Sequence, residues 1–273
     1  MVEYQPYEGS LTGNTKDIKT IGLTYGSLPT PQKKGYSFDG WYLNPDLTGI
    51  VTESTIVTNT NNHTLYAKYT INSYTLSINS NGGTYPWSTS VTQKYLSTTT
   101  VTRPSRSNYL FDGWSVSGAG SITDNASTNQ IYTYGAGNGT ITANWISKNK
   151  SVSISNSSYA LISEPDGTIK VAANNMNYRH KVTLTLKPGE SIEYKLYRIN
   201  SIHTAQFRVD DSIYTNGSTA GALTEKTYVN ESGYDVAIEL RVQAGISVEE
   251  GEEPYVQIVK VTTKYGETYN LTH

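Results

Sequence analysis

The segment Tyr36-Ser37-Phe38-Asp39-Gly40-Trp41 returns with few changes as Tyr109-Leu110-Phe111-Asp112-Gly113-Trp114, and the two tryptophans lie 73 positions apart. Further downstream, Thr64 to Tyr69 after the first copy matches Thr140 to Trp145 after the second. Aromatic and polar side chains alternate within the motif, which is the period of a strand with one apolar face. The chain therefore contains a tandem repeat of roughly 70 residues, and the repeated unit is built from strands.

The aromatic residues of the two motifs are expected to form the cores of two small domains. Trp41 and Trp114 should occupy equivalent buried positions, because a unit of this size has little other large apolar surface. Gly40 beside Trp41 predicts a β-bulge or a close backbone approach. The predicted core residues are Tyr36, Phe38, Trp41, Tyr109, Phe111 and Trp114.

The order of motifs in residues 2–147 resembles the Listeria–Bacteroides repeat, the B-repeat family of internalin-type surface proteins. The matching segments are Tyr25-Gly26, Gly35 to Tyr42 and Leu65 to Tyr69 in the first unit, and Asn81-Gly82-Gly83 and Phe111 to Trp114 in the second. The resemblance implies two tandem, β-grasp-like domains on an exported protein, and it implies no particular ligand.

The chain departs from the family pattern at three turns. Leu96 and Asn108 stand where the family has Gly, and Tyr7-Glu8-Gly9 replaces the Asn-Gly-Gly turn of the first unit. We also expect a strand from Ile18 to Tyr25 and a Gly-rich loop after Trp114.

From about Ser151 the pattern changes to short runs of period two, such as Val182/Leu184/Leu186 and Val236/Ile238/Leu240/Val242. Seven to nine short strands separated by turns predict an antiparallel β-sandwich. Pro188-Gly189-Glu190 is expected to be a hairpin turn, and a phase shift at Ile258-Val259 predicts a bulge. The expected architecture is mainly β, with repeat domains at 2–70 and 71–147 and the sandwich at 148–273.

Composition excludes several classes of function. The net charge is −2 and the charges are interspersed, so we expect no nucleic-acid partner. No apolar run approaches about 18 residues, which argues against insertion into a membrane. The chain has no cysteine, so disulfides and thiolate metal sites are excluded.

Catalytic and metal-binding patterns are also missing from the sequence. The histidines His63, His180, His203 and His273 are not spaced as a ligand pair, and no nucleophile elbow or phosphate-binding loop occurs. We therefore expect no enzyme activity, no metal and no cofactor. The acidic run from Glu249 to Glu253 is interpreted as a solvated hairpin tip in preference to a calcium site.

Exposed aromatic residues are the stronger candidates for a binding site. Trp87 has no aromatic counterpart in the first unit, so it either packs locally or offers a stacking platform for a sugar ring or a partner protein. In the third domain, aromatic and cationic side chains lie in sequence near a long polar loop, where recognition tends to occur. The candidates there are Tyr194, Tyr197, Arg198 and Tyr214.

These features favour a non-catalytic, surface-exposed structural or adhesion protein, in which the repeats are a spacer and the sandwich binds or attaches. The setting is extracellular: either a bacterial cell surface, with the chain an excised segment, or a phage virion, with the chain a head fibre or decoration protein. The alternative is a carbohydrate-binding module of a secreted bacterial protein. The expected partner is a protein or glycan on a host or neighbouring surface, with self-association through Tyr-rich edge strands as a further option.

Overall fold

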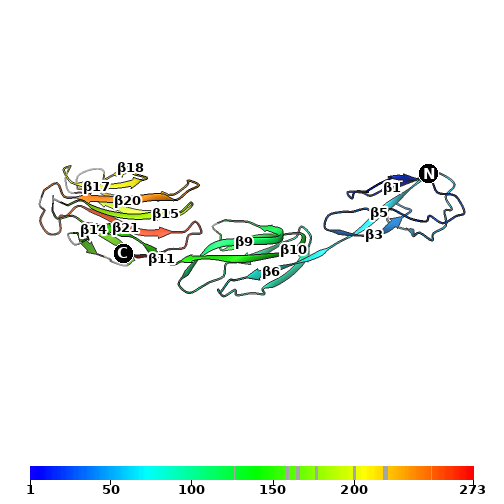
Figure 1. Ribbon diagram of the computed structural model, residues 1–273, viewed down its shortest axis with the longest axis horizontal. Coiled ribbons are helices and arrows are strands. Elements are labelled where there is room, and N and C mark those ends of the chain that lie inside the picture. Colours follow the sequence, from blue (N-terminus) through cyan, green and yellow to red (C-terminus); the bar gives the residue numbers. More distant parts are fainter. Residues whose placement is uncertain are drawn as a thin grey trace.

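The computed structural model describes residues 1–125, 127–157, 160–163, 167–175, 178–198, 201–217, 221–246 and 248–273. All the regular elements placed within these ranges are β-strands, so the prediction of a mainly β chain is confirmed. The strands form three consecutive groups, which lie in a row in Figure 1 with the N-terminus at one end. We call these groups unit 1 (2–71), unit 2 (73–147) and the sandwich (149–272).

Unit 1 is one mixed sheet in the order β2-β1-β5-β3-β4. Its strands are β1 (Val2–Gln5), β2 (Lys16–Asp17), β3 (Tyr36–Tyr42), β4 (Ile50–Val51) and β5 (His63–Ile71). The central β5 pairs in parallel with β1 and antiparallel with β3. This mixed sheet has no helix packed on it within the described residues, so the β-grasp comparison stays a prediction.

Two local expectations for unit 1 have different outcomes. The predicted bulge is confirmed, because Phe38 and Gly40 face the adjacent residues Tyr69 and Lys68 and leave Asp39 unpaired. The strand predicted from Ile18 to Tyr25 is wrong: this segment forms a turn, with Gly22 at a φ of 83° and the Leu23 N–H donating to the Thr20 carbonyl at 3.2 Å.

Unit 2 has longer strands in the order β7-β6-β10-β8, with β9 also paired to β10. It shares with unit 1 a central strand that pairs in parallel on one side and antiparallel on the other, whereas β8, which also pairs with β10, has no counterpart in unit 1. Its strands are β6 (Ser73–Asn79), β7 (Ser90–Lys94), β8 (Thr98–Thr102), β9 (Tyr109–Ile122) and β10 (Asn129–Ser147). The Gly-rich loop expected after Trp114 is wrong, since those glycines lie mostly inside β9 and β10. Two of them, Gly120 and Gly139, lie against the buried ring of Tyr132: a Cβ there would be 2.2 and 1.9 Å from its hydroxyl.

The sandwich consists of two five-stranded sheets in which every pairing is antiparallel, as predicted. One sheet contains β12 (Ser153–Ser155), β15 (His180–Leu186), β20 (Val236–Gln243), β17 (Thr204–Val209) and β18 (Ser212–Asn216). The other contains β13 (Leu161–Ser163), β14 (Ile169–Ala172), β21 (Tyr255–Thr262), β16 (Ser191–Tyr197) and β19 (Leu223–Val229). A short parallel pair, β11 (Asn149–Ser151) with β22 (Asn270–Thr272), lies at its end toward unit 2.

The turn at Pro188-Gly189-Glu190 differs from its prediction. It is a tight turn, with Gly189 at a φ of 78°, but it joins β15 to β16 in opposite sheets and so is not a hairpin. The alternation of apolar and polar residues in β15 and β16 does not distinguish a hairpin from this arrangement, because in both cases each strand buries one face in the core. The bulge expected at Ile258-Val259 is confirmed, since Glu193 faces Lys260 and Tyr194 faces Ile258.

The two motif tryptophans occupy equivalent strand positions with different burial. Trp41 is 1% exposed, and its indole N–H donates to the Pro29 carbonyl at 2.8 Å. Trp114 is only half-buried, and its buried indole nitrogen has no hydrogen-bond partner among the described residues. Phe38 and Tyr36 are half-buried, whereas Phe111 is fully buried.

Tyr109 is not a core residue, contrary to expectation, since 41% of it is exposed. Its neighbour Leu110 points the other way and joins the core of the sandwich. Tyr109 is thereby left at the start of its strand, where the Arg106 guanidinium lies 4.0 Å from the centre of its ring.

Candidate functional site

The aromatic residues proposed as ligand contacts are not brought together. Trp87 lies in unit 2 and is 69% exposed, beside a hollow of about 320 Å³ that Tyr85 and Val91 also line. Tyr197 and Tyr214 are in opposite sheets of the sandwich, on β16 and β18. Tyr214 remains 60% exposed, so Trp87 and Tyr214 could each contact a partner separately.

Tyr194 is excluded as a ligand contact. It is 1% exposed, its ring stacks on Phe207 with centroids 3.9 Å apart, and its hydroxyl donates to Thr215 at 2.9 Å. The inward phase of β16 places it in the core. Tyr197 stacks on Tyr255 at 5.2 Å, and Arg198 is half-buried at the end of the same strand.

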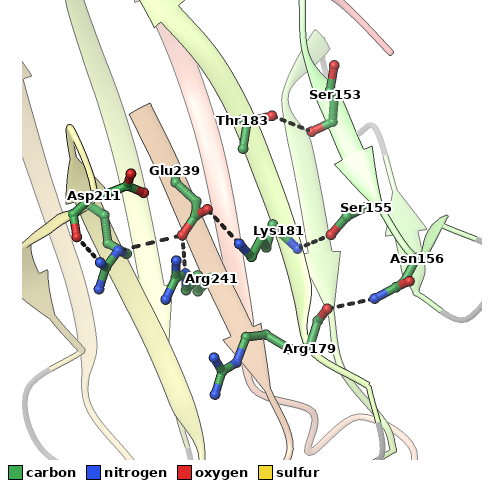
Figure 2. Close-up of polar contacts among 10 residues, drawn as sticks. Ser153, Ser155, Asn156, Arg179, Lys181, Thr183, Asp211, Glu239 and Arg241 are labelled. Atoms are coloured by element: carbon green, nitrogen blue, oxygen red, sulfur yellow. Dashed lines mark hydrogen bonds and ion pairs between the residues drawn. The ribbon is translucent and has the colours of Figure 1, made fainter. Parts of the chain in front are cut away.

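A polar network that the sequence did not indicate covers the outer face of the sheet β12-β15-β20-β17 (Figure 2). Strand register arranges its outward side chains in rows. One row reads Arg208, Glu239, Thr183 and Ser153 across the four strands. The next reads Gln206, Arg241, Lys181 and Ser155. We call these outward side chains, together with Arg179 just before β15, the charged face.

Glu239 is the centre of the charged face. Its carboxylate contacts Lys181 at 3.1 Å and Arg208 at 3.6 Å, and it also accepts a hydrogen bond from Arg241 (Figure 2). Partial burial by itself would raise the pKa of Glu239, but hydrogen bonds and charge from Arg241 and Lys181 outweigh burial and lower it. Three cations thus share one carboxylate.

A hollow of about 310 Å³ adjoins this network. The small side chain of Ala237 lies in it, and hydroxyl and carboxylate groups surround it: Ser151, Ser153, Thr183, Thr185, Asp211 and Glu239. The site therefore places hydrogen-bonding groups suited to hydroxyls next to cations suited to anions.

The junction between units 1 and 2 is a second functional feature. A single residue, Asn72, separates β5 from β6. Its N–H donates to the Gly35 carbonyl at 3.0 Å, and its carbonyl accepts from Tyr95 at 2.9 Å. The ring of Tyr95 also lies against Gly35, where a Cβ would be 2.1 Å from it.

The junction between unit 2 and the sandwich repeats these backbone bonds. Lys148 is the single residue between β10 and β11; its N–H donates to Asn108, the counterpart of Gly35, at 3.1 Å. The Lys148 carbonyl accepts from Asn270 of the sandwich at 2.8 Å. Each repeat is therefore joined to the following unit through one residue, and that residue makes the same two backbone hydrogen bonds at equivalent positions.

A turn of the sandwich further fixes the second junction. Tyr265 packs on Phe111 with ring centroids 5.3 Å apart, under the Arg103 guanidinium, and its hydroxyl donates to Asp124 at 2.6 Å. Glu267 accepts from the backbone N–H of Phe111 at 2.6 Å. Burial, reinforced by the Asp124 hydrogen bond, raises the pKa of Tyr265 to about 12, so the hydroxyl stays protonated near neutral pH.

Among the described residues, no group of three His, Cys, Asp or Glu side chains is arranged to hold a metal. No helix in the same part of the chain is long and apolar enough to cross a membrane.

Two relatives from Evansella cellulosilytica share part of the sequence. One, named as a candidate membrane protein, is 37% identical over 108 residues, which cover 38% of this chain and 16% of the relative. The other, named as a candidate Gly-rich membrane protein, is 34% identical over 118 residues, covering 41% and 13%. The match thus spans less than a fifth of either relative.

Likenesses to solved structures are distant. TmCBM61 in complex with β-1,4-galactotriose has a TM-score of 0.29 and 7% identity, covering 43% of this chain and 86% of that chain. The secreted serine protease VesC from Vibrio cholerae has a TM-score of 0.31 and 11% identity, covering 66% and 48%. No function is inferred from similarity at this level.

The repeats themselves give a firm assignment. The Listeria-Bacteroides repeat domain matches residues 1–68 and 74–144, which are units 1 and 2 and just over half of the chain. The chain therefore belongs to the Listeria-Bacteroides repeat family.

Proposed function

We propose that this chain is a non-catalytic surface module in which two repeat units form a stiff arm and hold the sandwich at a fixed orientation. The observation that carries the proposal is the repeated junction, where one linker residue is hydrogen-bonded on both sides. Single-residue linkers with buried contacts leave little freedom for the units to rotate.

The cell-surface setting has separate support. The family membership fits a surface structural or binding protein, and both Evansella relatives are named as membrane proteins. The same comparisons give no support to the virion setting, so we place the protein on the outside of a bacterial cell. The sandwich, with its charged face, is the binding or attachment end.

Surface exposure is the direct test of this setting. Antibodies against unit 1 and against the sandwich should label intact cells of the producing strain, and brief protease treatment should remove both signals without lysis. Labelling that requires permeabilised cells would contradict the proposal.

A further inference from the structure

The charged face places two like charges at directly opposed strand positions. Lys181 and Arg241 are directly opposite each other on the paired strands β15 and β20. Like charges at such cross-strand positions repel at short distance. Arg179 lies two residues before Lys181 and adds a further cation at the same edge of the network.

The other sheet of the sandwich provides an internal comparison. There, directly opposed charges have opposite signs: Lys195 faces Glu225, and Glu193 faces Lys260. Each of these lysines has its own carboxylate partner. Among the described cross-strand pairs of the two sheets, two cations face each other directly only at Lys181 and Arg241, and departures from such local rules tend to mark functional sites.

We propose that the charged face binds an acidic glycan. Its carboxylate would contact Lys181 and Arg241, because three cations that share Glu239 can accept a second anion. Its sugar hydroxyls would lie in the hollow beside Ala237, where Thr183 and Asp211 provide hydrogen-bonding groups. The Thr183–Glu239 row separates the Lys181–Arg241 row from the row of Ala237. The two sets of contacts are therefore about 13 Å apart along the strands. This is more than one saccharide unit spans, so consecutive units of one polymer would occupy them.

The ligand class follows from the two halves of the site. Cations alone would suit any polyanion, whereas hydroxyls and carboxylates around a hollow suit a sugar ring. The inference rests on the proposed function in one respect: because the protein is placed on the outside of a cell, the ligand is taken to be a polymer at a surface.

The test uses the full chain and three polymers in titration calorimetry: polygalacturonate, poly(glycerol phosphate) and neutral galactan. We expect polygalacturonate to bind, with galactan at least tenfold weaker and with affinity falling as salt rises. Poly(glycerol phosphate) carries the negative charge without a sugar ring, so it should bind more weakly than polygalacturonate. No binding of polygalacturonate at millimolar repeat units, or equal binding of galactan or of poly(glycerol phosphate), would overturn the proposal.

Matched variants separate this site from general charge attraction. Lys181→Gln with Arg241→Gln should weaken binding of the acidic polymer about tenfold or more. Lys195→Gln with Lys260→Gln removes the same charge from the opposite sheet and should change affinity less than about twofold. Equal losses in the two double variants would overturn the assignment of the face.

The test also controls for stability and for charge. Removing the opposed cations takes two of the three partners from Glu239 and should lower the melting temperature by a few degrees, so binding is compared well below the transition of the variant. Ala237→Trp fills the hollow without changing charge, and it should weaken polygalacturonate binding about tenfold. Unchanged polygalacturonate binding by Ala237→Trp would overturn the placement of the sugar. None of these outcomes bears on junction stiffness or surface exposure, so the two proposals fail separately.

Discussion

Left-handed backbone positions are shared by the two units even where the residue differs. Tyr7 and Asn81 have φ values of 47° and 48°, and Gly26 and Leu96 have 63° and 64°. Gly35 at 80° corresponds to Asn108 at 63°. Each departure from the family's sequence pattern therefore keeps the turn and places a side chain in a conformation that L-residues disfavour.

Leu96 is the most unfavourable of these residues, because Asn tolerates left-handed backbone and Leu does not. Its side chain is 63% exposed, so little apolar contact is lost on truncation. We expect Leu96→Gly to raise the free energy of unfolding by about 0.5–1 kcal/mol in denaturant titrations. Asn108→Gly should be close to neutral. A destabilised Leu96→Gly protein would show that the Leu side chain contributes contacts that outweigh the strain.

Glu239 gives the charged face a pH dependence of stability. Its pKa is lower in the folded chain than its ordinary value of 4.5. Its stabilisation is therefore complete above the unfolded pKa and is lost as the pH falls through the folded one. Glu239→Gln should cost about 2 kcal/mol or more at pH 7, because it leaves three cations without their carboxylate.

The measurement is the difference in unfolding free energy between the parent and Glu239→Gln from pH 7 to pH 3. This difference should shrink as the pH falls, since protonated Glu and Gln are both neutral. A difference that stays constant across this range would contradict the role of the ionised carboxylate.

At the scale of elements, the β9–β10 pair depends on glycines that the Tyr132 ring crosses. A Cβ at Gly139 would meet both the Tyr132 hydroxyl and the Ala119 carbonyl, at 1.9 and 2.5 Å. Gly139→Ala should therefore lower the free energy of unfolding by about 2 kcal/mol or more. Gly233→Ala, which would meet no atom within 4 Å, is the matched control and should be nearly neutral. Similar losses in both would mean that the Tyr132 contact does not determine the cost.

Strands with alternating residues could be predicted from the sequence, whereas features that depend on distant register could not. The motif strand, its bulge beside Gly40 and the sandwich class all follow from local period. The charged face does not, since Lys181 and Arg241 become neighbours only when β15 pairs with β20. For the same reason the sequence does not reveal that Tyr194 is buried. Either face of its alternating strand could be the exposed one until the position of the partner sheet is known.

At the scale of the whole molecule, matched aromatic residues of the repeats have different roles. Tyr25 is buried within unit 1, while its sequence counterpart Tyr95 crosses to unit 1 and packs on Gly35. The repeat predicts boundaries at 70 and 147, but it carries no signal that side chains cross between the units. Leu110 of unit 2 belongs to the core of the sandwich, and Tyr265 of the sandwich packs with Phe111 of unit 2.

These shared contacts predict that unit 2 and the sandwich unfold together. Tyr265→Ala removes a buried ring and should lower the free energy of unfolding by about 3 kcal/mol. Calorimetry should then resolve two transitions where the parent shows one for this pair. Unchanged cooperativity in the variant would mean that the backbone bonds of Lys148 alone couple the two parts.

The stiffness of the arm can be measured directly, because the chain has no cysteine to interfere with spin labelling. Labels are placed at exposed positions on either side of each junction: Ile18→Cys with Trp87→Cys, and Trp87→Cys with Tyr234→Cys. Pulsed electron paramagnetic resonance should give one narrow distance distribution for each pair in the parent. Tyr95→Ala should broaden the first, and Tyr265→Ala the second. Broad distributions in the parent, or narrow ones that neither variant changes, would contradict a stiff arm held by these two tyrosines.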